Sequence, residues 1–198
     1  MGELDEAMRL VLWREPQALV SLLFGPEVRV VGTEDTEAPV LRGRPDKLLR
    51  LRAPGRRGEV RCHVEIQAVW ESDLPARMHE YWTLGRLVHE HFESVLLVLK
   101  RGKKKGAPRD RLVVRGLDGE TQLEFRYRLL CAWHRRARQY LEGPPGWLPL
   151  VPFAPGAQRA HVVEAAERIR ATVRRGRAQA DLLAALETFA ESALPRSH

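Results

Sequence analysis

The sequence predicts an α/β protein built on a mixed central β-sheet, with additional helices at its C-terminal end. Three strand-like segments follow one another between residues 28 and 69 without a helical pattern between them, which argues against a doubly wound fold. A helical segment follows, and then a continuous apolar run at 94–100, which is typical of a strand covered on both faces. The segment from 158 to 193 shows helical periodicity and no strand-like pattern.

The composition indicates a globular protein with one core, or one domain with an appendage. Hydrophobic residues make up 44% and charged residues 30% of the 198 residues. The longest apolar run, at 95–99, is far shorter than the roughly 20 residues of a membrane span. Acidic residues before the first apolar segment argue against a secretory signal. Cys62 and Cys131 lie far apart in apolar contexts, so we expect free, buried thiols and a cytoplasmic protein.

An excess of basic residues favours a polyanionic partner. The chain has 33 Lys and Arg against 26 Asp and Glu, which gives a formal net charge of +7 at pH 7. A surface of this charge attracts nucleic acid. The alternative is a generally arginine-rich composition that serves no nucleic-acid partner.

The first half of the chain begins with a helical segment at 4–24, in which Pro16 is expected to kink the helix or restart it. Strands are expected next at 28–31, 46–52 and 60–69. The third strand alternates between two faces, one apolar with Cys62, Val64, Ile66 and Ala68, the other polar with His63, Glu65 and Gln67. We therefore expect one face in the core and the other in a groove.

The second half is expected to continue with a helix at 74–92 and a strand at 94–100. The runs at 112–117 and 122–130 flank Asp118-Gly119, a hairpin signal, although the second run could also lead into a helix. The remaining predictions are a helix at 133–141, an apolar Pro-rich linker at 147–153, and helices at 158–174 and 177–193. We divide the chain into a core at 1–130 and a C-terminal helical extension at 131–198.

The turn at 53–58 joins two strands that carry a carboxylate each. An antiparallel hairpin centred on this turn pairs residues whose numbers sum to about 111, which places Asp46 opposite Glu65. Gln67 lies one step further along the same face. Two convergent carboxylates beside a polar group suit Mg²⁺, which prefers oxygen ligands. The alternative is a surface hairpin whose charges point outward.

Several short motifs occur together in a specific order. They are Gly32-Thr33-Glu34, Arg44-Pro45-Asp46, Val64-Glu65-Ile66-Gln67 and the segment from Arg77 to Tyr81, followed by Cys131-Ala132-Trp133 and the Pro-rich segment at 147–152. In this order and spacing they resemble the Rpn family of recombination-promoting nucleases and transposase-like proteins, which belongs to the PD-(D/E)xK nuclease superfamily. The likeness covers roughly residues 4–175.

The resemblance implies a restriction-endonuclease-like αβββαβ core, in agreement with the expected element order. It implies that Asp46 and Glu65 bind Mg²⁺, for which Mn²⁺ can substitute, with the backbone carbonyl of Ile66 as a further ligand. Gln67 stands where the wider superfamily usually has lysine. Glutamine supplies no positive charge, so it can orient water or phosphate only through hydrogen bonds.

Other residues are candidates for supporting roles. Asp5 is a candidate for the metal site, with Glu6 and Glu34 as alternatives. Arg77 and Tyr81 share a helix face and are expected either to brace the strand or to contact the DNA backbone. An internal Arg–carboxylate pair and a packed Tyr are the alternative. The basic loop with Lys103, Lys104 and Lys105 is expected either to contact phosphates or to be a solvated surface loop.

The sequence thus supports three hypotheses. The first is a divalent-metal-dependent DNA endonuclease that hydrolyses phosphodiester bonds. The second is a catalytically weak or inactive nuclease-fold protein that binds DNA or a protein partner without cutting, which the missing lysine favours. The third, compatible with either, is a homodimer formed through the C-terminal helices.

Overall fold

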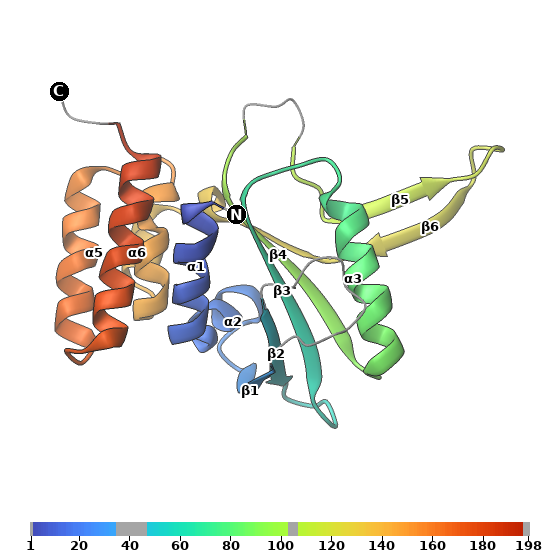
Figure 1. Cartoon of the computed structure of the whole chain (residues 1–198), viewed down its shortest axis with the longest axis horizontal. Coiled ribbons are helices and arrows are strands. Elements are labelled where there is room, and N and C mark those ends of the chain that lie inside the picture. Colours follow the sequence, from blue (N-terminus) through green and yellow to red (C-terminus); the bar gives the residue numbers. More distant parts are fainter. Residues whose placement is uncertain (1, 35–46, 103–106, 196–198) are drawn as a thin grey trace. The chain divides into compact units, whose positions relative to one another are not determined.

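The computed structural model describes residues 2–34, 47–102 and 107–195 (Figure 1). The chain forms two compact units. Unit 1 consists of Met1–Glu27, Leu99–Arg101 and Cys131–His198, and unit 2 consists of Val28–Val98 and Gly102–Leu130. The chain passes from unit 2 to unit 1 after Leu130, and the first 27 residues group with the C-terminal helices in unit 1.

Unit 2 is organised by a mixed five-stranded sheet in the order β1-β2-β3-β4-β7. Its strands are β1 (Arg29–Glu34), β2 (Lys47–Arg52), β3 (Val60–Val69), β4 (Phe92–Lys100) and β7 (Arg128–Cys131). The last residues of β4 and of β7 already belong to unit 1. The α/β class and the mixed sheet predicted from the sequence are confirmed.

The first three strands form an antiparallel meander. In the β2–β3 pair, Lys47 lies opposite Val64 and Leu51 lies opposite Val60. The two numbers of every described pair add up to 111, so the register expected from the turn is confirmed for these residues. Side chains directly opposite in such a pair share a face of the sheet.

Helix α3 (Leu74–Val88) follows β3 and contributes Leu74, Met78 and Tyr81 to the core. Pro75 lies in its first turn, where a missing N–H costs nothing. The helix ends four residues earlier than the predicted 92, because His89 is already extended and Phe92 begins β4.

A hairpin of β5 (Arg111–Arg115) and β6 (Thr121–Arg126) forms a separate two-stranded sheet. Gly119 has a φ of +82°, a conformation that glycine adopts without strain, and the hairpin prediction is confirmed. The alternative that residues up to 130 lead directly into a helix is wrong, since Arg128–Cys131 form β7 at an edge of the main sheet.

Unit 1 is helical. Helix α1 (Glu3–Arg14) packs on α6 (Arg177–Ala193), which also contacts α5 (Arg159–Thr172), and the three lie side by side in Figure 1. Pro16 restarts the chain as α2 (Pro16–Phe24), because proline is well suited to the first position of a helix. The expected helix at 133–141 is divided into a 3₁₀ turn η1 (Ala132–His134) and a short α4 (Ala137–Leu141).

The Pro-rich segment forms a buried 3₁₀ helix, η2 (Pro145–Phe153), and its prediction as a linker is wrong. The segment contacts α6 and α5, and its apolar side chains lie in the core of unit 1. Trp147 Nε1 donates a hydrogen bond of 2.5 Å to the carbonyl of Ala18. A Cβ at Gly146 would lie only 2.6 Å from that of Ala18, so the absence of a side chain permits this approach. No helix in the described part of the chain is long and apolar enough to cross a membrane.

Candidate functional site

The polar face of β3 is buried at its centre. His63 is 1% exposed and Glu65 is 4% exposed, although both alternate with the apolar side chains of the same strand. The expectation that this face opens onto a groove is therefore wrong at Glu65. The physical reason is α3, which places Arg77 and Tyr81 against these two residues.

Glu65 is the centre of this arrangement. Its Oε1 accepts a hydrogen bond of 2.8 Å from Gln67 Nε2 and another of 2.7 Å from Arg77 Nη2. Its Oε2 lies 3.6 Å from His63 Nε2, which is beyond hydrogen-bonding distance. We refer to His63, Glu65, Gln67, Arg77 and Tyr81 as the Glu65 cluster.

The charges of the Glu65 cluster act on one another. Burial opposes the charge of Arg77, but the Glu65 carboxylate and Tyr81 together outweigh it and raise the pKa of the guanidinium. Burial, reinforced by the Glu65 carboxylate, raises the pKa of Tyr81, while Arg77 opposes that shift. Arg77 therefore stays charged and Tyr81 neutral at physiological pH. The cluster is an ion pair beside a neutral phenol.

His63 belongs to the Glu65 cluster although the sequence did not single it out. Its ring lies edge-on to that of Tyr81, with centroids 4.7 Å apart at 75°. Neither ring nitrogen has a hydrogen-bond partner among the residues that the structure describes. Its place two residues before Glu65 on the same strand face was the signal that could have identified it.

The structure brings together Glu65, Gln67, Arg77 and Tyr81, as their positions on β3 and α3 predicted. The internal Arg–carboxylate pair and packed tyrosine, one of the two alternatives for the α3 residues, are the arrangement observed. Ile66, whose carbonyl was predicted to bind metal, lies next to Glu65 in β3.

The remaining candidate residues lie elsewhere or outside the described residues. Asp5 and Glu6 belong to α1 in unit 1, where Asp5 Oδ2 accepts a 3.3 Å hydrogen bond from the backbone N–H of Gly2. Glu34 is the last residue of β1. The other four candidates, Asp46, Lys103, Lys104 and Lys105, lie outside the described residues.

The ligand chemistry of the Glu65 cluster suits a hard cation. The carboxylate of Glu65 and the amide oxygen of Gln67 are of the type that Mg²⁺ prefers. Within residues 2–34, 47–102 and 107–195, no group of three or more His, Cys, Asp or Glu side chains is arranged to hold a metal ion. Asp46, the second carboxylate that the sequence predicts for this site, lies outside these ranges.

No protein-family model, curated protein or solved structure matches this chain. What the protein does must therefore be inferred from its own residues. The Glu65 cluster is the natural starting point, because a carboxylate, a guanidinium, a phenol and an imidazole meet there in a buried setting. Such groupings of titratable side chains occur preferentially at functional sites.

Proposed function

We propose that the protein is a divalent-metal-dependent DNA endonuclease whose site is built on Asp46 and Glu65. The observation that carries this proposal is the register of β2 and β3, in which Lys47 lies opposite Val64. Asp46 precedes Lys47 and Glu65 follows Val64 in the sequence, so a continuation of this register by one residue would pair the two carboxylates. Opposite residues of an antiparallel pair have Cβ atoms about 5 Å apart, which suits two ligands of one cation.

The order of the elements also supports the proposal. The described chain continues from α2 through β1, β2 and β3 to α3 and β4. This is the αβββαβ order that the resemblance to the Rpn family and the PD-(D/E)xK superfamily implies. The resemblance implies one metal-binding residue at the start of the second strand, Asp46, and one in the third strand, Glu65.

Three residues of the Glu65 cluster, Glu65, Gln67 and Arg77, have a role in the proposed site. Asp46, Glu65 and the carbonyl of Ile66 would hold Mg²⁺ or Mn²⁺. When bound, such an ion activates water and neutralises the charge that develops on a phosphate. Gln67 and Arg77 fix the Glu65 carboxylate through its Oε1, which leaves Oε2 as the oxygen without such a bond among the described residues.

DNA would be bound mainly through its phosphates. The net charge of +7 favours such a partner, and the lysines at 103–105 are the proposed phosphate contacts. Arg77 is only partly buried, with 34% of its side chain exposed, so it can approach a phosphate while it remains paired with Glu65. Contacts of this kind position the protein on DNA without reading its sequence.

The second candidate is a nuclease-fold protein that binds DNA or a protein partner without cutting. The ion pair between Arg77 and Glu65 favours it, because it already neutralises the carboxylate that a cation would need. Gln67 favours it too, since an amide cannot supply the charge of the usual lysine. Cleavage of DNA distinguishes the two candidates.

Incubation of the purified protein with supercoiled plasmid in Mg²⁺, Mn²⁺ or EDTA tests the proposal. Nicking or linearisation is expected with either metal and not with EDTA. Asp46→Ala and Glu65→Gln should abolish it, whereas Glu71→Gln, which removes an exposed carboxylate just before α3, should not. Undiminished cleavage by the double variant would locate the activity elsewhere. Binding in Ca²⁺ without cleavage in Mg²⁺ or Mn²⁺ would support the second candidate.

A further inference from the structure

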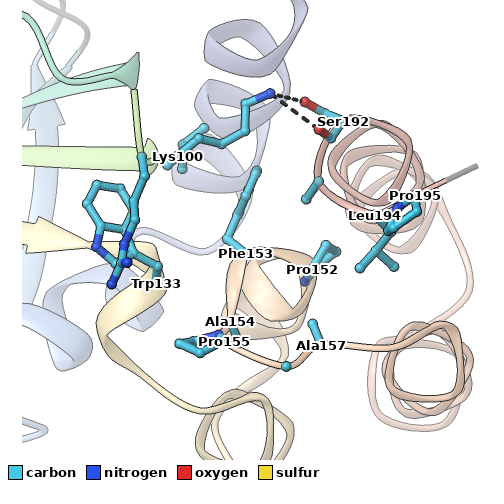
Figure 2. Close-up of a pocket in the computed structure, with 14 residues that line it drawn as sticks. Lys100, Trp133, Pro152, Phe153, Ala154, Pro155, Ala157, Ser192, Leu194 and Pro195 are labelled. Carbon is cyan, nitrogen blue, oxygen red and sulfur yellow. Dashed lines mark hydrogen bonds between the residues drawn. The ribbon is translucent and has the colours of Figure 1, made fainter. Parts of the chain in front are cut away.

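Unit 1 contains a pocket of about 460 Å³ that has no part in the proposed nuclease site. Figure 2 shows its position between the end of β4, Trp133, the end of η2 and the end of α6. Phe153 and Pro152 form part of its apolar wall, and Leu194 and Pro195 line it beyond the last turn of α6. This volume lies within the usual range for small-molecule sites, which are mostly apolar with a few polar groups.

The charged residues of the pocket are all cationic. Lys100 and Arg101 line it at the end of β4, and none of its lining residues is Asp or Glu. Lys100 Nζ donates hydrogen bonds to the hydroxyl of Ser192 at 2.5 Å and to its carbonyl at 3.4 Å, both of which are neutral acceptors. The guanidinium of Arg101 lies 5.9 Å from the centroid of the Trp133 ring.

Neither cation is neutralised by a carboxylate of the described chain. The ion pairs of unit 1, such as Arg14 with Asp181 and Arg138 with Glu164, involve other residues. Lys100 is also partly buried, and its ammonium is oriented by Ser192 beside the apolar wall. An unneutralised charge at the edge of an apolar, partly desolvated pocket attracts an anion more strongly than the same charge in water.

We propose that this pocket binds a small amphipathic anion. The headgroup, a carboxylate or a phosphate, would contact Lys100 and Arg101. An apolar body would occupy the space between Phe153, Pro152 and Leu194. The site is independent of the endonuclease proposal, because none of its residues belongs to the Glu65 cluster.

The fluorescent probe 1-anilinonaphthalene-8-sulfonate tests this inference, because its neutral analogue N-phenyl-1-naphthylamine has the same apolar body without the anion. The full-length protein is expected to bind the sulfonate saturably at one site and at least about tenfold more tightly than the analogue, as for a charge-assisted contact. Octanoate and octyl phosphate, each titrated against the bound probe, distinguish the two headgroups. Octanol is the neutral control.

Variants test the location of the site. Lys100→Met should weaken binding of the sulfonate by about tenfold, and Lys100→Arg should restore it. Ala157→Phe should block the pocket sterically, since Ala157 lines it in the loop before α5. Arg177→Met, which removes an exposed charge from the start of α6, is the matched control and should change nothing.

Three results would overturn the inference. They are equal affinity of the wild type and Lys100→Met for the sulfonate, equal affinity of the wild type for the sulfonate and its neutral analogue, and displacement of the probe by octanol as readily as by the two anions. Displacement by octanoate or by octyl phosphate, with octanol inactive, would support it and identify the headgroup.

Discussion

The ion pair between Arg77 and Glu65 is expected to contribute to the free energy of unfolding. Replacing Arg77 by Met keeps most of the apolar stem but leaves the 4% exposed Glu65 carboxylate without its cation. Breaking a fully buried pair costs about 3–5 kcal/mol, and an exposed pair about 0–1 kcal/mol. Because 34% of the Arg77 side chain is exposed and Gln67 still donates to Glu65, we expect a loss of about 2 kcal/mol.

A double-mutant cycle separates the electrostatic contribution from the loss of packing. In the Glu65→Gln background no buried charge has to be neutralised, so Arg77→Met should cost less than about 1 kcal/mol. The loss of packing is common to both backgrounds and cancels. The expected coupling between the two residues is therefore about 1–1.5 kcal/mol.

Urea unfolding at pH 7.5, followed by circular dichroism, measures the four free energies of the cycle. Arg86→Met is the matched control, since Arg86 is an exposed arginine of the same helix that donates to the carbonyl of His89. It should cost less than about 0.5 kcal/mol and show no coupling with Glu65→Gln. A coupling between Arg77 and Glu65 below about 0.5 kcal/mol would refute the assignment of a buried ion pair.

Three further predictions concern other parts of the chain. Gly85→Ala should destabilise the protein by about 1 kcal/mol in urea unfolding, because a methyl group at Gly85 would overlap the ring of Phe92. The cost of this overlap should exceed the gain in helix propensity from alanine. An equal or higher stability would contradict this packing. Burial raises the pKa of Cys131 to about 11 from 9.0, so its folded state disfavours the thiolate, and stability should be complete below pH 9 and fall as pH rises toward 11. Between pH 8 and 10.5 this thiol should contribute a loss of up to about 2 kcal/mol, which Cys131→Ala would remove; an unchanged pH dependence in that variant would exclude it. Replacing the lysines at 103–105 by Gln should lower the slope of log affinity for duplex DNA against log salt by up to about 0.9 per lysine, measured in Ca²⁺, whereas identical slopes would mean that they contact no phosphate.

Local patterns were sufficient to predict the centre of the sheet. Strict alternation of apolar and polar residues defined β3 at the bounds that the structure shows, and the turn before it fixed the register with β2. Pro16 and Asp118-Gly119 act through backbone conformation alone, so the helix restart and the hairpin could be predicted without knowledge of the tertiary structure.

The features that could not be predicted from the sequence depend on which segments are buried by tertiary packing. A run such as 147–153, with four apolar residue types and two prolines, is compatible with a linker or with a buried 3₁₀ helix. Only its packing against α5 and α6 selects the helix. The side chains of His63 and Glu65 follow the alternation of a half-exposed strand, and only the position of α3 shows that they are buried.

For the candidate site, spacing predicted which residues share a face but not how they pair. Arg77 and Tyr81 lie four residues apart on α3 and both reach the polar face of β3, as expected. Arg77 could pair with Glu65 or remain available for a phosphate. The distance between the two side chains decides between these, and the sequence spacing does not give that distance. His63 was not predicted as a site residue, although its position two residues before Glu65 on the same strand face could have identified it.

Binding of Mn²⁺ is the measurement that tests most directly whether Asp46 and Glu65 together hold a divalent cation. Isothermal titration of the wild type should show one saturable site that EDTA reverses. Asp46→Asn and Glu65→Gln should each weaken it by at least about tenfold, because each removes a charged ligand. Glu71→Gln, which removes an exposed carboxylate outside the Glu65 cluster, should leave the affinity unchanged. Wild-type affinity in Asp46→Asn or in Glu65→Gln would contradict the proposed metal site.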